Sequence, residues 1–261
     1  MVRRLIRPAL AAALLLLSGA CATVGGTGPA PLPASGYLDG GALDGLASQF
    51  TPSPQTLIWT GDTPGGGPGT DRWWLATAQA ELRAPEAAQH FDCILGTRLT
   101  EQPRPALTRL MNRLLVDSDA LTRRLAATWT RPRPVAVDPT LQPCQRLTDT
   151  LRDSPSWPAG GAVAGAAYGR LFAELAPDKG AMFQAMGHEI GLSRRICRMN
   201  WQGDVADGER IGQALYARAA ALPGFAADLE AARAEVTAAR TEGLTNPSCA
   251  SERRALSQGS N

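Results

Sequence analysis

The stretch PALTRLMNRLLVDSDALTRRLAATW, at positions 105–129 of a 261-residue chain, decides the fold. It opens on Pro105, which suits the first turn of a helix, and its apolar residues then return every three or four positions. This spacing gathers them on one face of an α-helix, where they can be buried against other helices. The residues concerned are Leu107, Leu110, Met111, Leu114, Leu115, Leu121, Leu125 and Trp129. The pattern predicts a long amphipathic helix.

Helical signals continue on both sides of this stretch. Asp71 can cap a helix and Pro85 can start the next one, and a proline-rich break follows the long helix at 131–143. The predicted helices cover 72–82, 86–95, 105–129, 144–152, 158–175, 178–197, 203–222 and 223–240. Alternating strand patterns are nearly absent, and small residues such as Gly165 allow helices to approach closely. We therefore expect an all-α fold, with a single helical-bundle domain over 71–245.

The segments outside this domain differ in composition. Residues 1–20 combine three arginines, an apolar run and small residues ahead of Cys21, which is typical of a secretory signal peptide. Two alternatives stay open at this point. Either Cys21 is the lipidated cysteine of a membrane-tethered lipoprotein, or cleavage follows Ala22 and releases a soluble periplasmic protein. Residues 22–70 are expected to form a glycine- and proline-rich tether and an irregular segment, and residues 246–261 a C-terminal tail.

The charge of the chain argues against nucleic acid as a partner. Its 26 basic residues exceed its 24 acidic residues, which gives a formal charge of +2 and a pI of about 8.4. Arg3, Arg4 and Arg7 lie in the predicted signal peptide, so removal of that peptide leaves a charge of −1. A protein without net positive charge lacks the electrostatic attraction on which nucleic-acid binding depends. The 44% hydrophobic content excludes a wholly disordered chain.

Four cysteines follow the predicted signal region and Cys21, namely Cys93, Cys144, Cys197 and Cys249. An even number in an oxidising compartment predicts two disulfide bonds, and the sequence leaves all three pairings open. The two histidines, His90 and His188, are far apart in the sequence, and no Cys-x-x-Cys pair occurs. We therefore expect no metal site and no cofactor.

Three segments combine arginines with the start of a helix. They are Arg124-x6-Arg131-Pro132, then Ser156-Trp157-Pro158-Ala159-Gly160-Gly161, then Ser193-Arg194-x5-Asn200-x3-Asp204. A single arginine predicts little here, because every basic residue except Lys179 is arginine. Three guanidinium groups next to free N–H groups at a helix N-terminus, however, form an anion site that suits a phosphate-like oxyanion best.

The order and spacing of these segments resemble the signature of the PAP2 superfamily, which includes the bacterial class A acid phosphatases and the vanadium haloperoxidases. That signature reads Lys-x6-Arg-Pro, Pro-Ser-Gly-His and Ser-Arg-x5-His-x3-Asp. Flanking stretches resemble the class A branch in particular: FDCILG at 91–96, SRRICRMNWQGD at 193–204 and LPGFAADLEAARAEV at 222–236. The resemblance covers about residues 70–250 and implies a helical bundle of the type that hydrolyses phosphomonoesters.

The resemblance also implies a role for each matching residue. Arg131 and Arg194 match the two arginines that bind the transferred phosphoryl group, and Arg124 stands where the signature has lysine. Gly160 matches the glycine whose backbone amide faces the phosphate. Asp204 matches the carboxylate that orients the nucleophilic histidine.

Both catalytic histidines of the signature are replaced. Asn200 stands where the family has its nucleophile, and Gly161 where it has the histidine that protonates the leaving group. The amide nitrogen of asparagine has its lone pair delocalised into the carbonyl and is no nucleophile, and glycine has no proton to donate. Ala159 replaces the signature's serine and removes a hydroxyl donor. Efficient turnover by the family's route is therefore not expected.

No other side chain is expected to replace the missing histidines. His188 lies six residues before Arg194 on one predicted helix, and that separation turns it about 240° away from the arginine. His90 is expected to pack between helices. Cys197 is expected to form a disulfide bond, since the related phosphatases carry a cysteine at this position.

The sequence thus favours a pseudophosphatase: an exported protein, periplasmic or membrane-tethered, that keeps a phosphate or phosphomonoester pocket but is catalytically impaired. Two alternatives stay open. One is an active periplasmic acid phosphatase that uses a modified mechanism. The other is a structural or interaction lipoprotein whose arginines only pair with carboxylates. The sequence leaves the identity of the ligand and the oligomeric state open.

Overall fold

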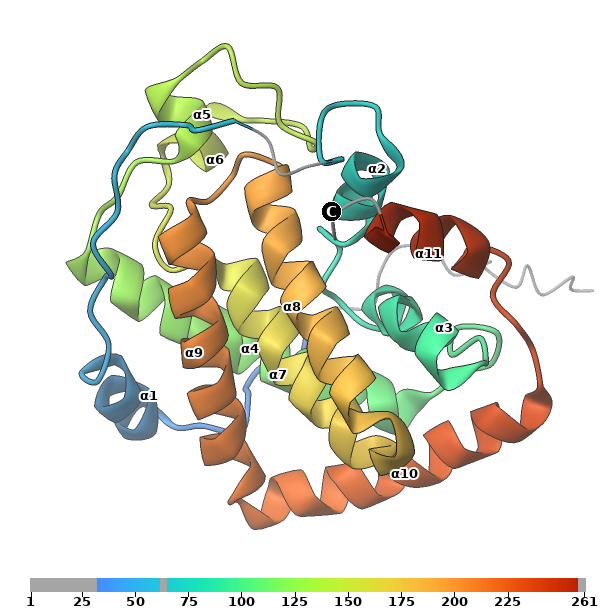
Figure 1. The fold of residues 1–261 in the computed structure, drawn as a ribbon. Helices are drawn as coiled ribbons and strands as arrows, with labels where there is room; N and C mark the ends of the chain where they lie inside the picture. The colour runs from blue at the N-terminus through green and yellow to red at the C-terminus, as the bar shows by residue number, and fades with distance from the viewer. Residues whose placement is uncertain (1–31, 62–64, 258–261) are drawn as a thin grey trace, which may run out of the picture.

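A computed structural model describes residues 32–61 and 65–257, and this part of the chain contains α-helices and two short 3-10 helices but no strand. The predicted all-α fold is confirmed (Figure 1). The predicted signal peptide at 1–20, Cys21 and the first part of the predicted tether lie outside the described residues. Within the described ranges, no helix is both long enough and apolar enough to span a membrane.

Three neighbouring helices form the centre of the fold: α7 (Gly160–Leu175), α8 (Gly180–Ile196) and α9 (Gln202–Ala220) (Figure 1). Helices α7 and α8 are in very close contact. A Cβ atom on Gly187 of α8 would lie 2.5 Å from the carbonyl oxygen of Gly165 in α7, so only glycine fits there. Most side chains of α7 are buried by its neighbours, which makes this helix the axis of the bundle.

Helix α4 (Pro105–Thr128) begins at the predicted proline and packs against α7. Its predicted apolar residues are all buried, and they join the main hydrophobic core of the molecule. Trp129 is the exception, since it lies just beyond the helix and is 42% exposed. Helix α10 (Pro223–Glu242) also packs against α4, and Figure 1 shows it crossing one end of the bundle.

Helix α1 (Gly40–Ala47) lies where the sequence predicts only a tether and irregular structure. The Asp39 carboxylate caps it by accepting a hydrogen bond of 2.8 Å from the N–H of Ala42. Leu43 and Leu46 are buried and pack on the main core. The three glycines of the helix lower its intrinsic propensity, and packing of these two leucines compensates for that.

Helix α11 (Cys249–Ser257) lies in the predicted C-terminal tail and packs on α2 (Asp71–Ala78). A disulfide bond between Cys93 and Cys249 holds it there. The helix is short and rich in charge, so its sequence shows no strong apolar face. Its position depends on a covalent bond whose pairing the sequence leaves open.

The remaining elements are short: η1 (Glu86–Phe91), α3 (Asp92–Leu95), α5 (Pro134–Val137), α6 (Asp149–Asp153) and η2 (Pro177–Lys179). The predicted helix over 144–152 is reduced to α6, because the Thr148 hydroxyl caps it by accepting a hydrogen bond from the N–H of Leu151. The second disulfide bond, Cys144–Cys197, ties this segment to the end of α8. Both predicted disulfide bonds are therefore present.

Candidate active site

The three arginine-bearing segments meet at one end of the bundle, where α7 and α9 begin and α8 ends (Figure 1). Backbone hydrogen bonds join them. The N–H of Ala159 donates to the carbonyl oxygen of Asp204 at 3.1 Å, and the N–H of Ser156 donates to that of Arg131 at 2.7 Å. Backbone hydrogen bonds alone therefore hold together segments that are distant in the sequence.

A cavity of about 290 Å³ opens at this end of the bundle. Its polar and glycine lining comprises Asp119, Thr122, Arg133, Gln145, Gly160, Gly161, Arg194 and Asn200. Four of these residues, namely Gly160, Gly161, Arg194 and Asn200, belong to the predicted site. The structure therefore brings together the second and third predicted segments, from the N-terminus of α7 and the C-terminal end of α8.

Two guanidinium groups line the cavity, and among the described residues neither donates a hydrogen bond to a carboxylate. Arg194 donates from Nη1 to Oε1 of Gln145 at 3.1 Å. Arg133 donates to the Ser154 hydroxyl and, at 2.8 Å, to the carbonyl oxygen of Met199. Burial lowers the pKa of each arginine to about 10, and the charge of Arg133 contributes to the shift at Arg194. Both side chains therefore stay charged near neutral pH, and their like charges repel each other.

The N-terminus of α7 adds donors to the same cavity. Its capping residue, Ala159, makes no side-chain hydrogen bond, and the N–H groups of Gly160 and Gly161 have no acceptor among the described residues. Free N–H groups at the start of a 16-residue helix carry partial positive charge and attract anions. A Cβ atom on Gly161 would lie 2.5 Å from Cδ of Arg194, so the arginine occupies the space of the missing side chain.

Arg124 and Arg131, which the sequence groups with Arg194, do not line this cavity. Arg124 donates from Nε to the Asp44 carboxylate in α1 at 2.8 Å. Arg131 donates from Nη1 to Oδ1 of Asp204 at 2.5 Å. Acidic partners hold both side chains elsewhere, which corrects their expected position beside the phosphate.

The sequence does not single out Arg133, nor the neutral and acidic cavity residues Thr122, Gln145 and Asp119. The chain has two consecutive Arg-Pro pairs, Arg131-Pro132 and Arg133-Pro134, and the first matches the signature with Arg124 at the lysine position. The structure places the second arginine beside Arg194. Counting the spacing of the signature back from Arg133 leads to Ala126 at the lysine position, so this register retains no basic side chain there.

The predicted carboxylate, Asp204, is fully buried behind the cavity. Its Oδ2 accepts hydrogen bonds from the Ser156 hydroxyl at 2.5 Å and from the N–H of Trp201 at 3.1 Å. Asn200 donates from Nδ2 to the carbonyl oxygen of Ser156 at 2.5 Å. Ser156 thus lies between the carboxylate and the amide, and the hydrogen bonds of Asp204 go to Ser156, Arg131 and the backbone rather than to Asn200.

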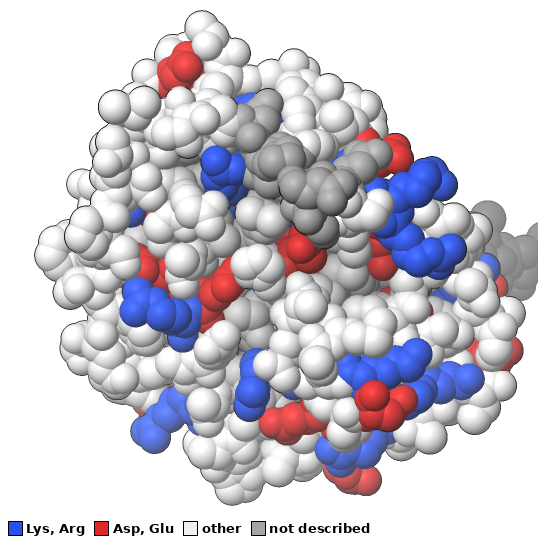
Figure 2. Space-filling view, viewed as in Figure 1, with Lys and Arg blue, Asp and Glu red and all other residues white. Residues whose placement is uncertain are grey.

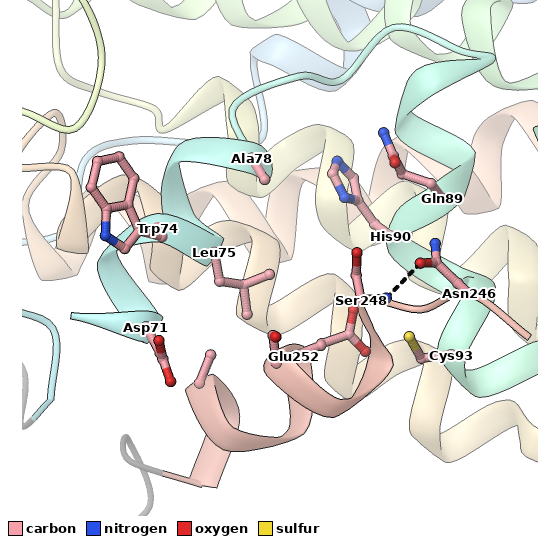
Figure 3. A pocket seen from close by; sticks show the side chains of 12 residues that line it. Asp71, Trp74, Leu75, Ala78, Gln89, His90, Cys93, Asn246, Ser248 and Glu252 are labelled. Atoms are coloured by element: carbon pink, nitrogen blue, oxygen red, sulfur yellow. Dashed lines mark hydrogen bonds between the residues drawn. The ribbon is translucent and has the colours of Figure 1, made fainter. Parts of the chain in front are cut away.

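Neither histidine lies near the two cavity arginines. His188 is half-exposed and shares a hydrogen bond of 2.6 Å with Glu209. His90 is buried, and its Nε2 hydrogen-bonds the carbonyl oxygen of Glu81 at 2.8 Å. It lines a separate cavity of about 230 Å³ between α2 and α11, which Figure 3 shows together with Trp74. Among the residues that the structure describes, no cluster of His, Cys, Asp or Glu is arranged to hold a metal ion.

The charged residues on the face shown in Figure 2 are mixed in sign. Uncharged residues cover most of that face, and lysine and arginine side chains are scattered among aspartate and glutamate side chains. Ion pairs such as Arg240–Asp178 and Arg254–Asp71 join partly exposed side chains of the molecule.

The chain is similar over much of its length to bacterial proteins named as acid phosphatases. It is 31% identical to an acid phosphatase of Zymomonas mobilis over 178 residues, which cover 68% of this chain and 67% of that protein. It is 27% identical to a non-specific acid phosphatase of Salmonella typhimurium over 171 residues, 64% of this chain and 68% of the relative. For one of Providencia stuartii the identity is 28% over 167 residues, 64% and 67% of the two chains. A scan against family models finds no match.

Proposed function

This chain belongs to the bacterial acid phosphatase family, and we propose that it keeps a phosphate-binding cavity while it has lost most of the phosphoryl-transfer chemistry. The proposed ligand is inorganic phosphate or the phosphate group of a phosphomonoester. In this proposal Arg133 and Arg194 bind the oxyanion from two sides, and the N–H groups of Gly160 and Gly161 bind it from the end of α7.

One observation carries the proposal: two neighbouring arginines line one cavity, and among the described residues their hydrogen bonds go to neutral acceptors rather than to a carboxylate. Two other arginines of low exposure are paired with carboxylates, Arg72 with Glu189 and Arg131 with Asp204. A pair of like charges in a partly desolvated site is unfavourable by itself. A dianion between them reverses the sign of the interaction and gains charge-assisted hydrogen bonds.

The loss of chemistry follows from the residues that replace the catalytic groups. Without the general acid at Gly161, the rate falls by about 10²–10⁴. Without a nucleophile at Asn200, the loss can reach about 10⁶, and the two effects do not simply add. Binding and charge stabilisation alone leave about 10³–10⁴ over the reaction in water. Any remaining turnover is therefore far below the usual range of about 1–10³ s⁻¹.

We also propose that the protein is exported to the periplasm. The composition of residues 1–20 supports an export signal, and two disulfide bonds suit an oxidising compartment. Lipidation at Cys21 would add a membrane tether. Mass spectrometry of the mature N-terminus tests this directly, because a diacylated Cys21 and a free N-terminus after Ala22 differ in mass.

The binding proposal is tested by calorimetric titration with inorganic phosphate. We expect binding of one phosphate per chain, weakened about 10–150-fold in Arg133→Gln and in Arg194→Gln, because each loses hydrogen bonds to a charged ligand. Arg124→Gln is the matched control and should bind as the unaltered protein does, since Arg124 lies outside the cavity. Absence of binding in the unaltered protein would instead favour the structural alternative.

A second candidate function, slow hydrolysis by water, is favoured by the position of Asp119. Its carboxyl group lines the same cavity, and burial raises its pKa above the ordinary value. There it would take a proton from a water molecule as the water oxygen attacks phosphorus, and return that proton to the leaving oxygen as the ester P–O bond breaks, which releases the alcohol and phosphate. A weak hydrolysis rate that disappears in Asp119→Asn but persists with unchanged phosphate affinity would support this candidate. A rate that is the same in Asp119→Asn excludes it.

A further inference from the structure

The hydroxyl group of Thr122 is buried and has no hydrogen-bond partner. Thr122 lies in the last two turns of α4. A helical threonine can satisfy its hydroxyl on the carbonyl oxygen four residues earlier, which here would be that of Ser118, and it does not. A buried hydroxyl without a partner costs stability, so its retention calls for an explanation.

The position of this hydroxyl supplies the explanation. A Cβ atom on Gly160 would lie 3.4 Å from Cγ2 and 3.6 Å from Oγ1 of Thr122. The threonine is therefore directly beside the first residue of α7, and it lines the same cavity as Arg133 and Arg194. An oxyanion that accepts hydrogen bonds from the N–H groups of Gly160 and Gly161 would lie next to Oγ1.

We propose that Thr122 is a further phosphate-binding residue, whose hydroxyl donates a hydrogen bond to an oxygen of the bound oxyanion. It supplies from α4 a hydroxyl donor that the neighbouring position 159, here alanine, does not provide. This inference rests on the proposed phosphate site and adds a donor to it. It also gives a hydrogen-bond partner to a buried polar atom of a cavity-lining residue that has none within the described part of the protein.

A purely structural role of the hydroxyl and a role in phosphate binding predict different phosphate affinities for one conservative substitution. Thr122→Val keeps the shape of the side chain and removes only the hydroxyl. If the hydroxyl is a packing defect, the substitution stabilises the protein and leaves phosphate binding unchanged. If the hydroxyl binds the oxyanion, the ligand-free protein is equally or more stable, while affinity for phosphate falls.

The experiment measures the dissociation constant of inorganic phosphate by calorimetry for Thr122→Val and Thr122→Ser, together with the thermal stability of each protein without phosphate. We expect Thr122→Val to weaken binding about tenfold or more, because a hydrogen bond to a charged ligand is lost. Thr122→Ser restores the hydroxyl and should bind within a few-fold of the unaltered protein. Thr108→Val, on the same helix 14 residues away and about 21 Å along its axis, is the matched control and should change nothing.

The possible results separate this inference from the function on which it rests. If the unaltered protein binds phosphate through Arg194 and Thr122→Val binds equally well, the role of Thr122 is wrong and the phosphate site stands. If the unaltered protein binds no phosphate, the proposed phosphate site and the proposed role of Thr122 are both wrong. If Thr122→Val and Thr122→Ser weaken binding to the same extent, the side-chain shape rather than the hydroxyl matters, and the inference is again overturned.

Discussion

Arg131 and Arg133 stand two positions apart in the sequence and meet different partners. Arg131 is paired with the fully buried Asp204, whereas Arg133 faces a cavity and has only neutral acceptors. The same side chain therefore neutralises a buried carboxylate at one position and, at the other, lies beside a cavity where we propose that it binds an anion. For a single arginine, the group with which its side chain interacts indicates its role, whereas the presence of the charge alone does not.

This difference predicts distinct effects on stability. Arg131→Gln leaves the Asp204 carboxylate buried without its guanidinium, which we expect to lower the free energy of unfolding by about 3–5 kcal/mol. Arg124→Gln removes a largely exposed pair with Asp44, which contributes about 0–1 kcal/mol. Urea unfolding of the two variants measures both values. Equal losses would show that the Arg131–Asp204 pair is not the structural element we describe.

At the scale of elements, the contact between α7 and α8 fixes the shape of the site. The start of α7 supplies the free N–H groups, and the end of α8 supplies Arg194. The close approach of Gly165 and Gly187 sets the distance between these helices. The cavity therefore depends on a glycine contact that lies farther along the bundle.

If the cavity depends on this contact, a methyl group added at Gly187 should affect both stability and phosphate binding. In Gly187→Ala the new Cβ would lie 2.5 Å from a backbone oxygen, so the helices must separate. We expect a loss of about 1–3 kcal/mol in the free energy of unfolding, together with weaker phosphate binding. Gly224→Ala, at the start of α10 with no atom near the new Cβ, is the control. A Gly187→Ala protein as stable as this control would contradict the packing.

The contact of α11 with the rest of the molecule predicts a dependence of stability on pH. Burial, with a contribution from Asp92, raises the pKa of Glu252 in α11 to about 7, and burial raises that of Asp92 to about 6. Both values exceed those of the unfolded chain. Because the folded protein holds these two protons more tightly than the unfolded chain, their contribution to the free energy of unfolding is complete below about pH 4. It is lost as the pH rises through 6 and 7.

Melting temperatures measured between pH 4 and pH 8 test this prediction. In Glu252→Gln the melting temperature should decrease less with rising pH than in the unaltered protein, because, of the two groups, only Asp92 still loses a proton. Glu230→Gln alters an exposed carboxylate of α10 and should keep the full decrease. Identical curves for Glu252→Gln and the unaltered protein would contradict the assignment.

The helices that the sequence predicts correctly are those with a long apolar face or a proline start, such as α4 and α10. Helices α1 and α11 are short, and tertiary contacts stabilise them: two buried leucines in one case and the Cys93–Cys249 bond in the other. No local pattern encodes such contacts. For the same reason the sequence identifies Gly160 and Arg194 by motif but cannot tell which of two adjacent Arg-Pro pairs reaches the cavity.

At the scale of the whole molecule, the chain has an all-α fold, and Asn200 and Gly161 stand where the resemblance to the PAP2 signature leads us to expect histidines. The fold brings two arginines and the start of α7 to one cavity, and neither histidine lies there. In the proposed function, Asn200 and Gly161 account for the loss of the reaction, while the charges of Arg133 and Arg194 remain available to bind phosphate. Binding and catalysis are then separate properties, and one experiment can measure both.

The most direct test is a single-turnover experiment with excess protein and a radiolabelled phosphomonoester, quenched rapidly and compared with a parallel equilibrium-binding measurement. We expect the label to be bound at equilibrium, this binding to be about 10–150-fold weaker in Arg133→Gln, and no label to become covalently attached to the chain. A covalent phospho-adduct formed within the dead time of mixing, or binding that Arg133→Gln leaves unchanged, would contradict the proposed function.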